Sequence, residues 1–186
     1  MASGYSVAPG FSPQKLLGHA RDLVPSAAGR GRPPQVGLRR AVSAAYYAVF
    51  HALTERLAGA SLAHLAPGDL SVLRRQIDHA ALDRALRAAS GRGAPTLHDP
   101  RAKQLGHLAR ATLARNATVR DLAKRFSTLR KEREAADYDH VKMFNRGEVL
   151  ELVRSAELAL RAVGSLTDEE ARTLFALALL VQRPPR

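Results

Sequence analysis

One uninterrupted amphipathic stretch, from Val36 to Gly59, constrains the fold of this chain more than any other feature. Its main apolar residues recur at steps of three and four: Val42, Ala45, Val49 and Leu53. That spacing places them on one face of an α-helix, whereas a half-buried strand alternates at every second residue. Alanine and leucine, which are strong helix formers, dominate the apolar residues of the whole chain, and runs of β-branched residues are scarce. We therefore predict an all-α protein.

Proline and glycine divide the rest of the chain into further predicted helices. Ser12 followed by Pro13 is typical of a helix start, and so are the capping patterns TVRD at 118–121 and TDEE at 167–170. The expected helices cover residues 12–24, 36–59, 70–90, 103–115, 119–144 and 148–163, with a last helix after 167–170. The length of 186 residues fits one domain. The expected organisation is a flexible tail over 1–11, a helical bundle over 12–163, and a C-terminal helix and tail over 164–186.

The chain is strongly basic, with a formal net charge of +12. Domains this basic are commonly drawn to a polyanion, most often nucleic acid. Four arginines predicted to lie in or beside loops could contact a phosphate backbone: Arg30, Arg32, Arg92 and Arg101. The alternative is a compositional bias of an arginine- and alanine-rich proteome, which raises the net charge without any binding role.

The chain contains no cysteine, which excludes disulfides, a thiolate nucleophile and a zinc–thiolate site. No other group of residues has the spacing of metal ligands, so we expect neither a metal nor another cofactor. The longest apolar run, Leu174 to Val181, is far shorter than the roughly 20 residues that span a bilayer. The first residues lack the features of a signal peptide. We therefore expect a cytoplasmic protein with no membrane segment.

The predicted helix over 119–144 has a face that changes from apolar to polar. Its apolar stripe continues, at steps of three and four, from Leu122, Phe126 and Leu129 to Arg133, Asp137 and His140. On one helix, Arg133 and His140 would lie within about 20° of each other and about 10 Å apart, with Asp137 between them. Such groups on a core stripe are costly unless they are paired or line a wet cleft. The alternative is a salt bridge at the end of a bundle, beside a solvated histidine.

A second polar stripe runs along the helix predicted over 36–59. It consists of Arg40, Ser43, Tyr47 and His51, again at steps of three and four. These side chains could contact a substrate, and packing is the alternative, because tyrosine and histidine on such a helix are common core residues.

Two segments together resemble the HEPN superfamily, a group of small helical-bundle domains. The first is LRRAVSAAYYAVFHAL, with Arg39, Arg40, Ser43 and the string from Tyr46 to His51. The second is REAADYDH, with Arg133, Ala136, Asp137 and Tyr138. The resemblance covers roughly residues 12–163 and implies a HEPN-like antiparallel helical bundle with flanking helices.

The resemblance implies metal-independent cleavage of RNA through attack of the ribose 2′-OH. His140 would move protons, Arg133 would stabilise the charged phosphorane, and Asp137 would orient one of them. A homodimer would bring two such pairs together across a cleft, with Arg40, Ser43, Tyr47 and His51 as the opposite wall. The expected protein is a toxin- or defence-like endoribonuclease.

A second class of function stays open beside the ribonuclease. It is a non-catalytic HEPN module that binds a nucleotide, a nucleotidyltransferase or another protein such as an antitoxin, with Tyr138 as a residue that the partner modifies. Glu134 favours this class, since it stands directly after Arg133, where family members commonly have asparagine. His140 and the net charge favour the ribonuclease.

Overall fold

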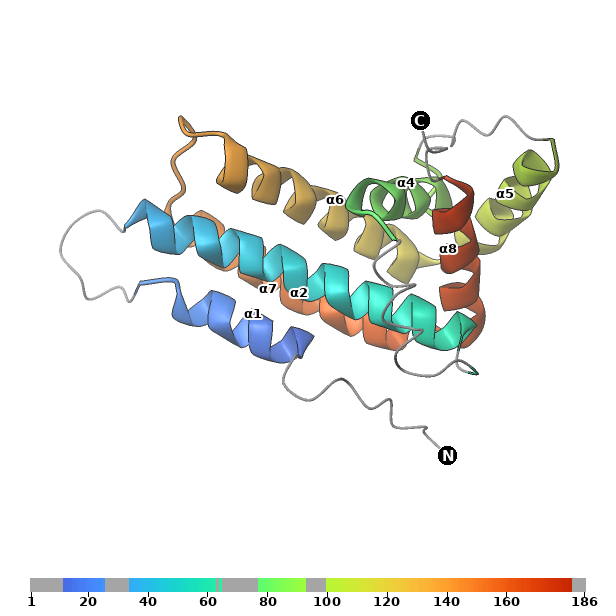
Figure 1. The fold of residues 1–186 in the computed structure, drawn as a ribbon, viewed down its shortest axis with the longest axis horizontal. Helices are drawn as coiled ribbons and strands as arrows, with labels where there is room; N and C mark the ends of the chain where they lie inside the picture. Colours follow the sequence, from blue (N-terminus) through green and yellow to red (C-terminus); the bar gives the residue numbers. More distant parts are fainter. Residues whose placement is uncertain (1–11, 26–33, 63, 65–76, 93–99, 182–186) are drawn as a thin grey trace. The chain divides into compact units, whose positions relative to one another are not determined.

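The computed structural model describes residues 12–25, 34–62, 64, 77–92 and 100–181 of the chain. Over these residues it is helical with no strand, so the all-α prediction is confirmed. The helices are α1 (Pro13–Asp22), α2 (Gln35–Ser61), α4 (His79–Ala89), α5 (Pro100–Leu113), α6 (Ala117–Tyr138), α7 (Arg146–Ser165) and α8 (Asp168–Leu180) (Figure 1). None of the described helices combines the length and the apolar character that crossing a bilayer requires.

The chain forms two compact units, each built from segments that are far apart in the sequence. The first contains residues 1–52 and 125–161, and the second contains residues 53–124 and 162–186. The boundaries fall inside α2, α6 and α7.

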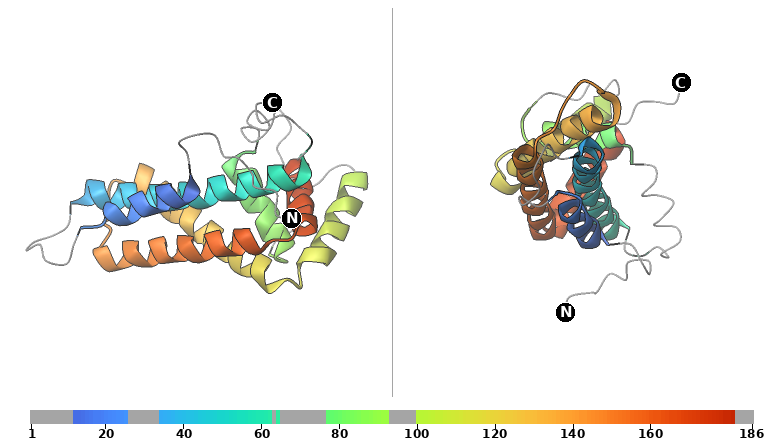
Figure 2. Two further views of the ribbon diagram at one scale, coloured as in Figure 1. Left: turned by 90° about the horizontal axis from the view of Figure 1, so that it is seen from below. Right: turned by 90° about the vertical axis from the view of Figure 1, so that its left-hand side faces the viewer.

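The first unit is an antiparallel bundle of α1 with parts of α2, α6 and α7, which lie side by side in the right-hand view of Figure 2. Its core includes residues of the predicted stripes: Val42, Ala45, Val49, Phe126 and Leu129, all fully buried. Each large apolar side chain buried in this way stabilises the fold by about 1.5–3 kcal/mol. The predicted apolar faces are therefore the faces that pack.

The helix starts show which capping predictions hold. Ser12 caps α1 and Thr167 caps α8 through a capping box with Glu170, as predicted. The capping box predicted at 118–121 is wrong, because Asn116 Oδ1 accepts hydrogen bonds from the amides of Thr118 (2.8 Å) and Val119 (3.2 Å), so that α6 begins at Ala117. Side-chain caps of this kind satisfy amides that have no partner within the helix.

The helix predicted over 70–90 has a different start in the described residues. α4 begins at His79, because the Asp78 side chain accepts a hydrogen bond from the Ala81 amide at 2.5 Å and forms the N-cap. Residues 70–76 of that prediction and the tail predicted over 1–11 lie outside the described residues.

In the second unit, α4, α5 and α8 pack against one another. Arg56 from the last turns of α2 pairs with Asp168 at 2.7 Å and donates to the carbonyl of Leu166 at 2.6 Å. Arg84 of α4 donates to the carbonyl of Val181 at 3.2 Å. Arginines from other helices thus hold both ends of α8. At the N-terminal end Arg56 does so through Asp168, the first residue of the helix.

Candidate functional site

Arg133 of α6 is the centre of a polar cluster in the first unit. Its Nε lies 2.7 Å from Oδ2 of Asp137, one helical turn later, and its Nη2 donates to the hydroxyl of Tyr47 on α2. The Nε–H does not point at the carboxylate, so the contact with Asp137 is an ion pair rather than a linear hydrogen bond. The Arg133 side chain is only 16% exposed.

Asp137 uses its second oxygen to bind α2 as well. Ser43 Oγ donates to Asp137 Oδ1 at 2.7 Å, and the Asp137 side chain is 29% exposed. We call Ser43, Tyr47, Arg133 and Asp137 the Arg133 cluster. The predicted pairing of Arg133 with Asp137 is confirmed. The polar stripe of α2 was expected to face the polar end of α6 across a dimer cleft, but Ser43 and Tyr47 contact α6 within one chain.

Aromatic rings enclose the guanidinium of Arg133. Its Cζ lies 5.2 Å from the ring centre of Tyr47 and 5.9 Å from those of Tyr46 and Tyr138. Such stacked cations are favourable contacts, especially when they are shielded from water. Arg133, with which the α6 stripe becomes polar, is therefore accommodated within the first unit by ion pairing, a hydrogen bond and aromatic faces.

The same contacts act on the pKa of Arg133. Burial lowers it, but the hydrogen bond with Tyr47 and the charges of Tyr47, Asp137 and Tyr138 together raise the pKa above its ordinary value. Arg133 is thus a permanent cation whose charge is compensated by a carboxylate of its own chain.

His140 does not lie on the same helix as Arg133, because α6 ends at Tyr138 rather than at 144. The prediction that the two share one helix face is therefore wrong. The Asp139 side chain accepts hydrogen bonds from the amides of Val141 (2.9 Å) and Lys142 (3.1 Å) and turns the chain away from the helix. Those amides of Lys142 and Val141 lower the pKa of Asp139. His140 is exposed in this turn.

Arg39 provides the second reason why α6 ends at Tyr138. Its guanidinium donates to the carbonyls of Ala135 (3.4 Å), Ala136 (2.7 Å), Asp139 (2.7 Å) and Lys142 (2.6 Å). These include carbonyls that a helix leaves without partners at its C-terminus, where positive charge is favourable. Sequence reasoning missed this role: Arg39 belongs to the quoted motif, but no local pattern connects it with the end of α6.

The segment 139–145, which we call the α6–α7 loop, is held firmly but presents apolar side chains. Lys142 pairs with Glu132 and, at 3.4 Å, with Glu148. Gln35 exchanges two hydrogen bonds of 2.9 Å with the backbone of Phe144. Even so, Val141 is 88% exposed and Tyr138, just before the loop, is 71% exposed.

Lys142 keeps its charge in this loop. Burial lowers its pKa, but the hydrogen bonds and charges of Glu132 and Glu148 outweigh burial and raise the pKa. The ammonium therefore ties the loop to both α6 and α7 throughout the neutral range.

The other predicted site residues lie in different environments. His51 is partly buried, its ring stacks on Tyr47 at 6.1 Å, and burial lowers its pKa. Arg40 is exposed on α2. Arg92 of the predicted loop arginines is exposed, whereas Arg30, Arg32 and the side chain of Arg101 lie outside the described residues.

Neither a metal site nor a relative identifies the cluster. In the part of the chain that the structure describes, no three histidine or acidic side chains are grouped to hold a metal ion. No protein-family model, no curated protein and no solved structure matches this chain.

Proposed function

We propose that this chain is a non-catalytic HEPN-like module that binds a protein partner through Tyr138 and the α6–α7 loop. The observation that carries the proposal is the state of Arg133. The cation expected to stabilise a phosphorane is instead paired with Asp137, bonded to Tyr47 and largely buried.

Phosphate binding at Arg133 would be costly. A phosphate oxygen would have to displace the Asp137 carboxylate or share the guanidinium with it, and two like charges so close repel each other. Such an environment disfavours the phosphates of an RNA chain.

The α6–α7 loop supports protein binding instead. Exposed apolar side chains follow one another at this end of the first unit: Tyr138, Val141 and Met143. The loop is already ordered by Arg39, Asp139 and Lys142, so little conformational entropy is lost when a partner binds. Tyrosine and methionine are also enriched in protein interfaces. The HEPN resemblance makes a nucleotidyltransferase the first partner to test, with the hydroxyl of Tyr138 as the group that it modifies.

The homodimeric ribonuclease remains the second candidate. The exposed imidazole of His140 and the net charge of +12 favour it. In that case a second copy would have to bring the imidazole to a guanidinium that has left Asp137.

Site-specific photo-crosslinking in the native host tests the proposed interface. A photoreactive amino acid placed at Val141 should give one discrete crosslinked protein. The same amino acid at Arg154, an exposed position on α7, is the matched control and should give none. Crosslinks from position 141 that reach only RNA, or only a second copy of the chain, would contradict the proposal.

A further inference from the structure

A second surface lies in the second unit, on α5 and the first turns of α6. From Lys103 to Lys124 the sequence has five cations and a single carboxylate, that of Asp121. The helix α7, which has a similar length, carries three basic and three acidic residues. A compositional bias alone would not concentrate the positive charge in one segment in this way. We call these five residues the α5–α6 cations: Lys103, Arg110, Arg115, Arg120 and Lys124.

The α5–α6 cations are not neutralised by the part of the chain that the structure describes. Elsewhere Arg21, Arg56 and Arg133 pair with carboxylates at 2.5–2.7 Å. No described carboxylate pairs with any of the α5–α6 cations. Four of the five residues are exposed, and Arg110 is partly buried. Their charge is therefore open to an external anion.

The two helices hold these cations in a row. Lys103 and Arg110 are seven residues apart on α5, so they lie within about 20° of each other and about 10 Å apart along the helix axis. Arg120 continues the row from α6, because its Nη1 donates to the carbonyl of Ala114, just after α5, at 2.8 Å. Lys124 follows one turn later on α6. The spacing of the charges is thus set by rigid elements.

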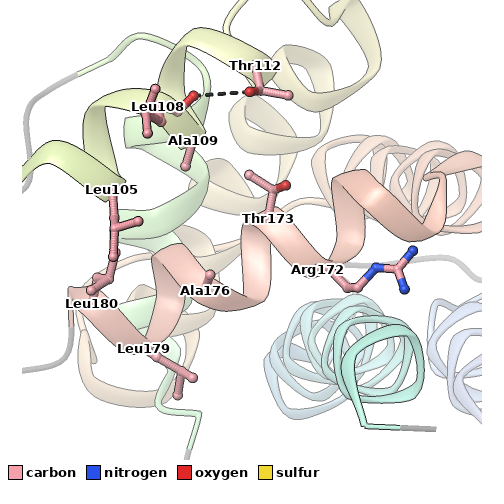
Figure 3. Close-up of a pocket in the computed structure, with 9 residues that line it drawn as sticks. All are labelled: Leu105, Leu108, Ala109, Thr112, Arg172, Thr173, Ala176, Leu179 and Leu180. Carbon is pink, nitrogen blue, oxygen red and sulfur yellow. Dashed lines mark hydrogen bonds between the residues drawn. The ribbon is translucent and has the colours of Figure 1, made fainter. Parts of the chain in front are cut away.

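The exposed leucines of α5 lie on a different face from these cations. Leu105 and Leu108 line an apolar groove with α8, and neither Lys103 nor Arg110 takes part in it (Figure 3). Leu105 is two residues after Lys103, which places it about 200° further round the helix. The buried centre of a protein interface is mainly apolar. A face that offers cations without large apolar side chains therefore fits a polyanion better than a folded protein.

The segment also lacks a platform for unstacked bases. No phenylalanine, tyrosine or tryptophan occurs from Pro100 to Lys124, whereas proteins that bind single strands stack the bases on aromatic side chains. In a duplex the bases are stacked inside, and each strand exposes one phosphate per about 3.4 Å of axis. The distance of about 10 Å from Lys103 to Arg110 spans about three such phosphates.

We propose that the α5–α6 cations bind the phosphate backbone of a double-stranded nucleic acid without reading its sequence. This inference goes beyond the function proposed for the α6–α7 loop and is independent of it, since it rests on other residues in the other unit. Binding displaces counterions from the phosphates, so the affinity falls steeply as salt is added.

Fluorescence anisotropy with the full chain and labelled oligonucleotides tests the proposal. The probes are DNA and RNA duplexes of about 20 base pairs and the matching single strands. A duplex should bind with a dissociation constant of about 10⁻⁴ to 10⁻⁶ M at physiological salt, and a duplex of scrambled sequence should bind equally well. The single strands should bind at least about fivefold more weakly, because no aromatic side chain stacks on their bases.

Two double variants of equal charge separate the row from the net charge. Lys103→Gln with Arg110→Gln should weaken duplex binding at least about tenfold and reduce the slope of log affinity against log salt by about two. Arg154→Gln with Arg161→Gln, at exposed residues of the first unit, is the matched control and should change the affinity less than about twofold. Lys124→Gln alone, at an exposed residue, should weaken binding about threefold. Circular dichroism checks that each variant is folded.

Four results would overturn the proposal. Equal weakening by the two double variants would mean that only the net charge attracts the duplex. Single strands that bind as tightly as the duplex, or duplex binding that salt does not weaken, would exclude a row that contacts phosphates of a duplex. If the wild type binds phosphatidylserine vesicles but no duplex, the cations serve a membrane surface instead.

Discussion

Asp137 lies one helical turn after Arg133 and approaches its Nε to 2.7 Å, while its other oxygen accepts a hydrogen bond from Ser43. One carboxylate thus neutralises the cation of α6 and connects α6 to α2. The cluster is therefore a packed element of the first unit, in which polar groups of α2 and α6 pair with one another. A nuclease that used Arg133 would need this guanidinium to leave the Asp137 carboxylate.

Removal of the Asp137 charge should destabilise the fold. We expect Asp137→Asn to lower the free energy of unfolding by about 1–2 kcal/mol, because it leaves a largely buried guanidinium without its counter-charge. Glu134→Gln is the matched control, since Glu134 pairs with Arg130 at 2.9 Å nearer the surface, and it should cost less than about 0.5 kcal/mol. Urea denaturation measures both. Equal effects of the two substitutions would count against a structural role for Asp137.

The two neighbouring arginines of α2 should differ strongly. Arg39→Ala should destabilise the protein by about 2–3 kcal/mol, because it removes the charged donor for the carbonyls at the end of α6. Arg40→Ala, at an exposed residue, should change stability by less than about 0.5 kcal/mol. Hydrogen exchange should also show faster exchange in the α6–α7 loop of Arg39→Ala alone. If the loop exchanges equally fast in both variants, Arg39 does not hold it.

The turn at Asp139 should open at low pH. The amides of Lys142 and Val141 lower the pKa of Asp139 below its ordinary value of 3.8. Because the folded pKa is the lower one, the turn is fully stabilised above pH 3.8 and loses this contribution as pH falls through the folded pKa. The NMR amide shifts of Val141 and Lys142 should follow this titration. Asp139→Asn, which keeps one oxygen acceptor, should retain the turn, and Asp139→Ala should lose it.

His51 should make stability depend on pH in mildly acidic solution. Burial lowers its pKa below 6.5, so between the folded pKa and 6.5 the unfolded chain binds more protons than the folded chain. This contribution is complete above pH 6.5 and is lost as pH falls toward the folded pKa. In urea titrations His51→Gln should flatten this part of the stability profile, whereas His107→Gln, at an exposed residue of α5, should leave it as in the wild type. An unaltered slope in His51→Gln would refute the assignment.

Helical periodicity predicts the helices of this chain well, because the residues of a buried apolar stripe lie only three or four positions apart in the sequence. α2 and α7 lie within two residues of their expected bounds, and Thr167 caps α8 as its sequence indicates. The end of α6 could not be predicted in this way. A cation from α2 ends the helix, and only the tertiary fold brings Arg39 to those carbonyls.

In the candidate site, too, contacts between residues close in sequence could be predicted, whereas those that depend on the tertiary fold could not. The pairing of Arg133 with Asp137 follows from a four-residue step and is confirmed. The contacts of Ser43 and Tyr47 follow from their polar stripe, but the sequence does not say whether a stripe faces another helix of the same chain or a second copy. His140 lies in a turn in which the Asp139 side chain accepts a hydrogen bond from the Val141 amide. The helical periodicity predicted over 119–144 did not indicate this turn.

Cleavage of RNA by the intact chain decides between the binding module and the ribonuclease. Wild-type protein, Arg133→Ala and His140→Ala are incubated with a broad panel of RNAs in EDTA, and the fragments and their end groups are followed after circular dichroism has shown that each protein is folded. We expect no cleavage by the wild type above that of the two variants, because Asp137 and Tyr47 already occupy the guanidinium. Wild-type fragments that end in cyclic phosphates, and that disappear in both folded variants, would contradict this expectation and establish the ribonuclease.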